Sequence, residues 1–165
     1  MEGKQLISRA DMVSKIKAAV HVRNVDDIVI IARTDARAVN GFDDAIERSL
    51  AYADAGADVI FLEAPQSVEE MEKAVRLVQK PMMANLVEHG KTPFLTGKQL
   101  EDLGYKIVIY PVSTIYAVTK AINDLLSSLR KADTTLEYGT HMVQFPDFNN
   151  MIGLNKEREF EKMFQ

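Results

Sequence analysis

Four short, unbroken runs of apolar residues restrict the fold of this chain more than any other feature of its sequence. The runs cover residues 28–32, 59–62, 81–84 and 107–110. None of them alternates with polar residues, and three are rich in β-branched side chains. Strands that are buried on both faces of a parallel sheet have this composition. The runs therefore predict four parallel strands.

Amphipathic segments with helical spacing separate these runs. They cover residues 12–20, 46–53, 71–78 and 115–129. Three helix starts carry a capping-box pattern, in which a side-chain oxygen accepts from a free backbone N–H. These starts are Ser8-x-x-Asp11, Ser67-x-x-Glu70 and Thr96-x-x-Gln99. Gly56 and Gly104 follow helical segments, where a left-handed residue ends a helix. The order α-βα-βα-βα-βα predicts an α/β fold with four parallel βα units.

The last part of the chain does not continue this pattern. Residues 133–135 interrupt it, and Phe145-Pro146-Asp147 indicates a turn. Residues 155–164 have the spacing of a short charged helix. We therefore expect two parts: residues 1–132 with the βα units, and residues 133–165 as a helical C-terminal arm that packs on another subunit.

The composition argues against several classes of protein. The chain has 165 residues, of which 47% are hydrophobic, and this is enough for one packed core. A net charge of −4 without any basic run argues against a nucleic-acid partner. No apolar run approaches the roughly 20 residues that cross a membrane, and no segment resembles a signal peptide. The absence of cysteine excludes a cysteine nucleophile or thiolate metal ligand from this chain. We expect a cytoplasmic protein.

Polar side chains follow each predicted strand. They are Arg33-Thr34-Asp35 after the first strand, Glu63 after the second, Asn85, Glu88 and His89 after the third, and Tyr110 and Ser113 after the fourth. The carboxyl ends of parallel strands share one face, which carries the chemistry in barrels and open α/β sheets. Arginine binds a carboxylate or phosphate through two N–H groups, and glutamate suits a hard cation. Asparagine can donate to a developing oxyanion. The set predicts a site where a cation and an arginine stabilise an enolate.

A structural interpretation of the same residues is also open. Strands emerge into water at these ends, so polar residues are common there. Arg33 and Glu63 can form a structural ion pair, and Asp35 can cap the following loop. Glu88 and His89 can be solvated surface residues.

The same segments resemble the isocitrate lyase / phosphoenolpyruvate mutase superfamily. The similar segments are, in order, 31–36 (IARTDA) with its continuation at 41–48, 55–64, 81–86 (PMMANL) with 91–93, and 110–113 (YPVS). Four such segments at family spacing are specific for the superfamily. The strongest similarity is to the methylisocitrate lyase, oxaloacetate decarboxylase and carboxyphosphonoenolpyruvate phosphonomutase branch.

The resemblance implies a (β/α)₈ TIM-type barrel, of which this chain would supply half, namely strands five to eight. It implies a Mg²⁺-dependent carbon–carbon lyase that acts on a small 2-oxo or 2-hydroxy acid through an enolate. Arg33 would hold the carboxylate or enolate, and Glu63 would lie near the metal and its waters. Asn85 and Ser113 would bind the substrate. The family also implies a homo-oligomer, a dimer or tetramer, in which subunits exchange their C-terminal arms.

The sequence also departs from the family pattern. Residues 1–4 resemble the stretch that follows the Cys-Gly-His lid motif, and that lid and the paired aspartates that hold Mg²⁺ have no counterpart here. The resemblance therefore implies a truncated chain with a missing N-terminal half, inactive or nearly so by itself. Four strands cannot close a barrel, so pairing with that half or with a second copy is expected.

Two departures concern the substrate. Tyr116 and Gln144 stand where methylisocitrate lyases carry arginines that bind the distal carboxylates of a tricarboxylate. We therefore expect a smaller substrate, as in oxaloacetate decarboxylation or malate-type cleavage.

Other functions stay open. Phosphonomutase or phosphonopyruvate hydrolase chemistry at a P–C bond passes through a similar enolpyruvate-like species, so the same strand-end residues would serve it. A non-catalytic half-barrel that only oligomerises would use apolar tail residues such as Phe145 and Phe160. A flavodoxin-like binding domain is disfavoured, because the chain lacks a glycine-rich phosphate loop.

Overall fold

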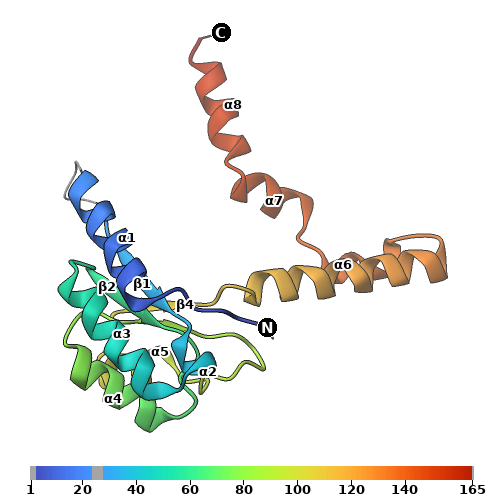
Figure 1. The fold of residues 1–165 in the computed structure, drawn as a ribbon. Helices are drawn as coiled ribbons and strands as arrows, with labels where there is room; N and C mark the ends of the chain where they lie inside the picture. The colour runs from blue at the N-terminus through green and yellow to red at the C-terminus, as the bar shows by residue number, and fades with distance from the viewer. Residues whose placement is uncertain (1–2, 24–27, 165) are drawn as a thin grey trace. The chain divides into compact units, whose positions relative to one another are not determined.

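The computed structural model describes residues 3–23 and 28–164, and within it the chain divides into two compact units, Met1–Thr114 and Ile115–Gln165. The first unit alternates helices and strands (Figure 1). Its elements are α1 Arg9–Val22, β1 Ile31–Thr34, α2 Ala36–Val39, α3 Phe42–Asp54, β2 Val59–Leu62, α4 Val68–Val78, β3 Met83–Asn85, α5 Gly97–Leu103 and β4 Ile107–Ile109. The α/β fold with four parallel strands is confirmed.

The strands pair in the order of the sequence. β1 pairs with β2 in parallel, from Ile31 opposite Val59 to Thr34 opposite Leu62, and β3 pairs with β4 from Met83 opposite Ile107. A parallel bridge between Ile60 and Met82 joins the two pairs. Among the described residues, β1 and β4 each have one partner strand and form the outer edges.

The first strand begins later than the sequence predicts. The apolar run starts at residue 28, whereas β1 starts at Ile31. The Ile30 N–H donates to the Asp58 carboxylate at 2.8 Å rather than to a neighbouring strand. Ile28 and Val29 are both 55% exposed. Where β1 was predicted to begin, the Asp58 side chain therefore takes the hydrogen bond that a neighbouring strand would otherwise accept.

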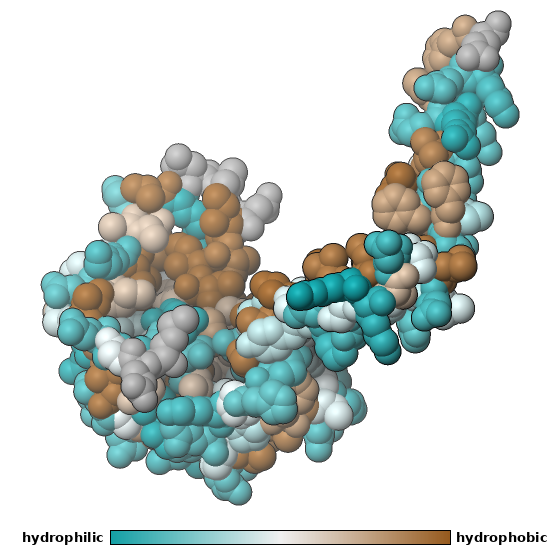
Figure 2. All heavy atoms as spheres, turned by 90° about the vertical axis from the view of Figure 1, so that its right-hand side faces the viewer, coloured by the Kyte–Doolittle hydropathy of each residue, from teal (hydrophilic) through white to brown (hydrophobic). Residues whose placement is uncertain are grey.

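The two faces of the sheet differ because alternate residues of a strand point to opposite sides. On one face, Val59, Phe61 and Met83 form a small apolar cluster, joined by half-buried Ile107 and Ile109. No helix residue belongs to this cluster. Figure 2 shows apolar atoms gathered in a hollow on the surface of the first unit.

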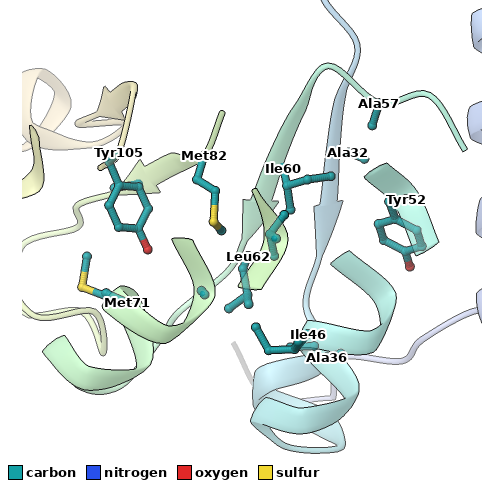
Figure 3. Packing of buried hydrophobic residues seen from close by; sticks show 14 of the residues in the cluster. Ala32, Ala36, Ile46, Tyr52, Ala57, Ile60, Leu62, Met71, Met82 and Tyr105 are labelled. Atoms are coloured by element: carbon teal, nitrogen blue, oxygen red, sulfur yellow. The ribbon is translucent and has the colours of Figure 1, made fainter. Parts of the chain in front are cut away.

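The opposite face carries the main core. Ala32, Ile60 and Leu62 point to this side, where Ile46 of α3 and Met71 of α4 pack against the strands (Figure 3). Ile60 and Met71 are completely buried. Burial of such side chains contributes roughly 1.5 to 3 kcal/mol each. The helix layer therefore holds the strands in place and fixes the direction of their carboxyl ends.

Helix boundaries follow the predicted caps. The Thr96 and Gln99 side chains form both halves of a capping box at α5. Ser67 accepts from the Glu70 N–H at 3.2 Å, but the Glu70 carboxylate binds Arg37 and the Gln66 N–H instead of closing the box. The predicted pattern at α4 is therefore only half formed.

The predicted helix ends are also present. Gly104 ends α5 with φ of 100°, and Gly56 follows α3 with φ of 103°. A β-carbon on Gly104 would lie 2.8 Å from Cγ1 of Val75. Both the backbone and the packing therefore require glycine at residue 104.

The second unit is helical. After α6 (Ser113–Ala132), which starts at the end of the first unit, it contains the 3₁₀ helix η1 (Leu136–His141), α7 (Phe145–Met151) and α8 (Leu154–Lys162). The short charged helix predicted near the C-terminus is α8. The turn predicted at Phe145-Pro146-Asp147 is wrong, since these residues open α7. Proline suits the first turn of a helix, because the backbone N–H groups of this turn have no hydrogen-bond acceptor within the helix.

The apolar stripe of α6 is present but uncovered. Ile115, Val118, Ile122 and Leu126 are between 49% and 60% exposed, and no residue of α6 is buried. Within the described part of the chain, no helix is both long enough and apolar enough to span a bilayer.

Candidate functional site

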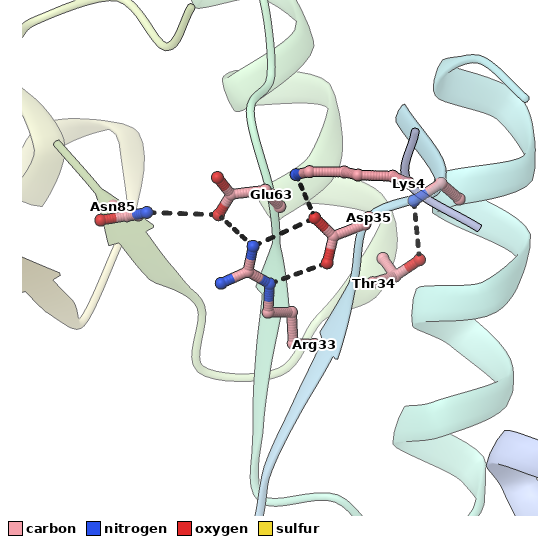
Figure 4. A network of polar contacts seen from close by, with 7 residues as sticks. Lys4, Arg33, Thr34, Asp35, Glu63 and Asn85 are labelled. Carbon is pink, nitrogen blue, oxygen red and sulfur yellow. Dashed lines mark hydrogen bonds and ion pairs between the residues drawn. The ribbon is translucent and has the colours of Figure 1, made fainter. Parts of the chain in front are cut away.

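The three principal predicted residues meet at the carboxyl ends of adjacent strands. Arg33 lies in β1, Glu63 directly follows β2, and Asn85 ends β3 (Figure 4). The Glu63 carboxylate accepts from Asn85 Nδ2 at 3.2 Å and lies 3.5 Å from Arg33 Nη2. A single carboxylate thus links an arginine of one neighbouring strand to an amide of the other.

Asp35 holds the arginine more closely than Glu63 does. Arg33 Nε and Nη2 donate to the two Asp35 oxygens at 2.8 and 3.0 Å, and Lys4 Nζ donates to the same carboxylate. The Arg33 hydrogen bonds, supported by Lys4, lower the pKa of Asp35 despite its partial burial. The same bonds raise the pKa of Arg33. Asp35 was predicted only as a possible loop cap, but its side chain forms a two-pronged ion pair.

An aromatic ring packs against the guanidinium of Arg33. Phe61 stands opposite Arg33 in the β1–β2 register, and Arg33 Cζ lies 4.9 Å from its ring centroid. Phe61 is 6% exposed, so the ring is fixed by its surroundings. This cation–π contact and the two carboxylates together define the direction in which Arg33 points.

Ser113 lies in a second group of polar residues. Its hydroxyl donates to a Glu88 oxygen, and this bond lowers the pKa of Glu88. Among the described residues, no hydrogen bond joins this pair to the Arg33, Glu63 and Asn85 group. His89 is exposed and has a left-handed backbone with φ of 61°. Ser113 and Glu88 therefore form their own hydrogen-bonded pair among the described residues.

Two buried oxygen atoms at these strand ends lack a hydrogen-bond partner in the described structure. They are Asn85 Oδ1 and Glu88 Oε2. Buried polar atoms are rarely left unpaired in folded proteins, because each costs the loss of its hydration. Both are acceptors, so each is available to a hydroxyl or amine donor.

A cavity of about 310 Å³ opens beside Arg33. Its lining includes Lys4, Met12, Arg33, Asp35, Arg48 and Tyr52. Sequence reasoning missed Lys4 and Phe61 as part of this region. The register opposite Arg33 could have indicated Phe61, but only the tertiary structure brings Lys4 to Asp35.

The described residues do not fit a divalent-metal site by themselves. Between residues 3 and 23 and between 28 and 164, no three His, Asp or Glu side chains lie close enough to hold a metal ion. The Glu63 oxygen that faces this cluster already receives Asn85 and Arg33. A Mg²⁺ site normally needs further carboxylates or phosphates.

The chain belongs to the phosphoenolpyruvate phosphomutase family, whose model matches residues 1–130. It is 48% identical to 2,3-dimethylmalate lyase of Eubacterium barkeri over 161 residues, which cover 98% of this chain and 56% of that protein. It is 44% identical to 2-methylisocitrate lyase of Aeropyrum pernix over 162 residues, covering 98% of this chain and 51% of that one. The chain spans about half the length of the curated relatives it matches.

Solved structures give the same assignment. The trigonal crystal form of 2,3-dimethylmalate lyase, a PEP mutase/isocitrate lyase superfamily member, superimposes with a TM-score of 0.88 at 30% identity. The match covers 99% of this chain and 55% of that one. Phosphonopyruvate hydrolase in complex with oxalate and Mg²⁺ gives a TM-score of 0.82 at 26% identity, over 98% and 59% of the two chains.

Proposed function

We propose that this chain forms the carboxylate-binding part of a carbon–carbon lyase site for a small 2-hydroxy or 2-oxo acid. The observation that carries the proposal is the meeting of Arg33, Glu63 and Asn85 at the carboxyl ends of three adjacent parallel strands. The 48% identity to a 2,3-dimethylmalate lyase supports this class of reaction over P–C bond chemistry.

Arg33 supplies the positive charge of the proposed site. When a 2-hydroxy acid is cleaved, a base takes the hydroxyl proton and the carbinol carbon becomes the carbonyl of a 2-oxo acid. The electron pair of the broken carbon–carbon bond moves to the carbon beside the second carboxylate and forms an enolate, which then takes up a proton at that carbon. A fixed guanidinium stabilises this developing charge without having to reorient. The contacts from Asp35 and Phe61 provide that fixation.

Asn85 and Glu63 act as a pair. Asn85 Nδ2 donates to Glu63, which leaves the buried Oδ1 as an open acceptor. We assign this oxygen to the substrate hydroxyl. Glu63 orients both the amide and the guanidinium. Ser113 belongs to the proposed site through Glu88, whose second oxygen is the other open acceptor.

Magnesium dependence is part of the proposal for the complete enzyme. A related phosphonopyruvate hydrolase is described in complex with Mg²⁺. In the complete enzyme, Glu63 would lie near the ion or its waters, and the main carboxylate ligands would come from outside the described residues. Mg²⁺, where bound, would neutralise negative charge on the enolate.

Two residues that stand where methylisocitrate lyases carry arginines bear on substrate size. Gln144 donates to the carbonyl oxygens of Gly139 and Met142 at 3.1 and 3.0 Å, so its side chain is engaged in the local backbone. Tyr116 is 52% exposed. Neither supplies a positive charge for a distal carboxylate. We therefore propose a dicarboxylate of malate size and not a tricarboxylate.

We also propose that the first unit is half of a (β/α)₈ barrel and that the active form is an assembly. At this outer edge of the sheet, Ile28 and Val29 are each 55% exposed and Ile31 is 43% exposed. Outer strands with apolar side chains tend to pair with further strands. Residues 133–165, together with the stripe of α6, would pack on another subunit. Size-exclusion chromatography with light scattering tests this, and a stable monomer contradicts it.

The function is tested with 2,3-dimethylmalate and the purified chain. Side-chain amide and guanidinium resonances are followed by NMR during titration, and release of a 2-oxo acid is assayed with Mg²⁺ present. Asn85 and Arg33 are expected to shift, and Arg33→Ala is expected to abolish the effect. Arg9→Ala, which removes an exposed arginine paired with Glu47, serves as the control.

The outcomes distinguish the candidate reactions. Perturbation of Asn85 and Arg33 at millimolar ligand supports the proposal, whether or not turnover is measurable. Phosphate release from phosphonopyruvate would assign P–C chemistry instead. No response at these residues to dimethylmalate, oxaloacetate or methylisocitrate would leave only a non-catalytic half-barrel.

A further inference from the structure

Lys4 reaches the site from a segment that is far away in the sequence. Its Nζ donates to Asp35, 31 residues further along the chain, and both side chains are about three-quarters buried. The segment is held in place by Arg48 of α3, whose Nη1 donates to the Ile7 carbonyl oxygen at 3.0 Å. Arg48 is only 8% exposed and is itself bound by Asp44 at 2.9 Å. Lys4 is therefore anchored from two sides.

The charges around Arg33 balance only when Lys4 is included. Arg33 faces the carboxylates of Asp35 and Glu63, so these three residues carry one net negative charge. Lys4 brings the group to neutrality. An anionic ligand approaches a neutral group far more readily than a negative one, because unscreened charges at these distances interact strongly.

The contact with Asp35 also decides which part of Arg33 is available. Nε and Nη2 both donate to Asp35, and Nη2 lies near Glu63 as well. The ring of Phe61 lies against the guanidinium. Nη1 has no hydrogen-bond partner in the described part of the chain. This nitrogen is therefore the donor that remains for a bound anion.

We propose that Asp35 and Lys4 are positioning residues of this site: Asp35 turns Nη1 of Arg33 toward the ligand, and Lys4 orients Asp35 and offsets its charge. The proposal rests on the anion-binding role of Arg33 in the proposed function. Neither residue needs to touch the substrate.

Binding of oxalate, measured by isothermal titration calorimetry without metal, tests the proposal. Asp35→Ala removes a negative charge but also releases the guanidinium that presents Nη1, and the second effect is expected to dominate and to weaken binding about tenfold. Asp35→Asn, which keeps one acceptor, is expected to weaken it less. Lys4→Met is expected to weaken binding about threefold, and Lys4→Arg to restore most of the loss. Lys98→Met makes the same change at an exposed lysine of α5 and should leave the affinity unaltered.

A double variant separates positioning from simple charge. If Lys4 acts through Asp35, Lys4→Met has little further effect in the Asp35→Ala background. An equal effect of Lys4→Met in both backgrounds would show that it acts only as a distant charge and would overturn the proposal. Unaltered affinity in Lys4→Met, or no oxalate binding to the unmodified chain, would overturn it too.

A ligand-free measurement accompanies the titration. The Arg33 Nε–H resonance should exchange slowly with water in the unmodified chain and in Lys98→Met, because this group donates to Asp35. It should exchange quickly in Asp35→Ala and at an intermediate rate in Lys4→Met. Fast exchange in the unmodified chain contradicts the fixed guanidinium. Oxalate binding that depends on Lys4, without any response to dimethylmalate, would sink the proposed lyase function but not the positioning roles.

Discussion

Helices α4 and α6 carry the same kind of apolar stripe, but the stripe of α4 is buried and the stripe of α6 is exposed. In α4, Met71, Ala74 and Val78 are buried beneath the first unit's strands, whereas no residue of α6 is buried. The two stripes have similar helical spacing in the sequence. An amphipathic pattern thus states which face of a helix is apolar, and not which surface covers it. The first unit buries the apolar stripe of α4, whereas in the described part of the chain no side chain of α6 becomes fully buried.

The largest expected effect is a difference in stability between the same substitution, isoleucine to alanine, in the two units. Ile60→Ala removes a fully buried side chain from β2 and should lower the free energy of unfolding by about 2 to 5 kcal/mol. Ile122→Ala changes a side chain of α6 that is 49% exposed and should cost less than about 0.5 kcal/mol. Urea denaturation followed by circular dichroism measures both. A large cost at Ile122 would show that the α6 stripe is covered in solution.

A second pair compares left-handed glycines. Gly104→Ala combines an unfavourable φ of 100° with a contact to Val75 and should cost about 2 kcal/mol or more. Gly153→Ala has φ of 80° but meets no neighbouring atom, so only about 1 kcal/mol is expected. Thermal unfolding of the two variants gives the ranking. Equal losses would mean that packing around Gly104 relaxes without cost.

The third comparison concerns helix starts. Thr96 caps α5 with its side chain, whereas Thr135 precedes η1 without a side-chain cap bond. Thr96→Ala should therefore lower stability by about 1 kcal/mol, and Thr135→Ala by much less. Hydrogen exchange of the first amides of α5 and η1 reports the loss locally. A greater loss of amide protection in η1 after Thr135→Ala than in α5 after Thr96→Ala would contradict this prediction.

The smallest expected effect is a pH dependence within the first unit. The folded pKa of Asp35 lies below its ordinary value of 3.8, so its contribution to stability is present above that pH and is lost as the pH falls through the folded pKa. The difference in stability between the unmodified chain and Asp35→Asn should therefore be constant near neutrality and shrink below about pH 4. Asp54→Asn, at an exposed position of α3, is the control. A difference that grows on acidification would contradict the Arg33 and Lys4 contacts.

Much of the site could be predicted, because it depends on strand direction. Arg33, Glu63 and Asn85 follow or end apolar runs, and parallel strands bring such positions to one edge. The pairing of Arg33 with Asp35 was not predicted. It depends on how the two side chains turn toward each other where β1 ends, and the sequence does not show this orientation. The hydrogen bond from Ser113 to Glu88 was not predicted, because it joins the first residue of α6 to a loop residue 25 positions earlier in the chain.

The resemblance of four sequence segments indicated the family. The sequence by itself also determined the α/β class, the parallel strands and most helix boundaries. These properties arise from local periodicity, capping side chains and left-handed glycines, which act within a few residues. Only the tertiary structure decided that Lys4 meets Asp35 and that the apolar stripe of α4 is buried while that of α6 is exposed. These outcomes depend on contacts between distant segments, and no local pattern records which surfaces will meet.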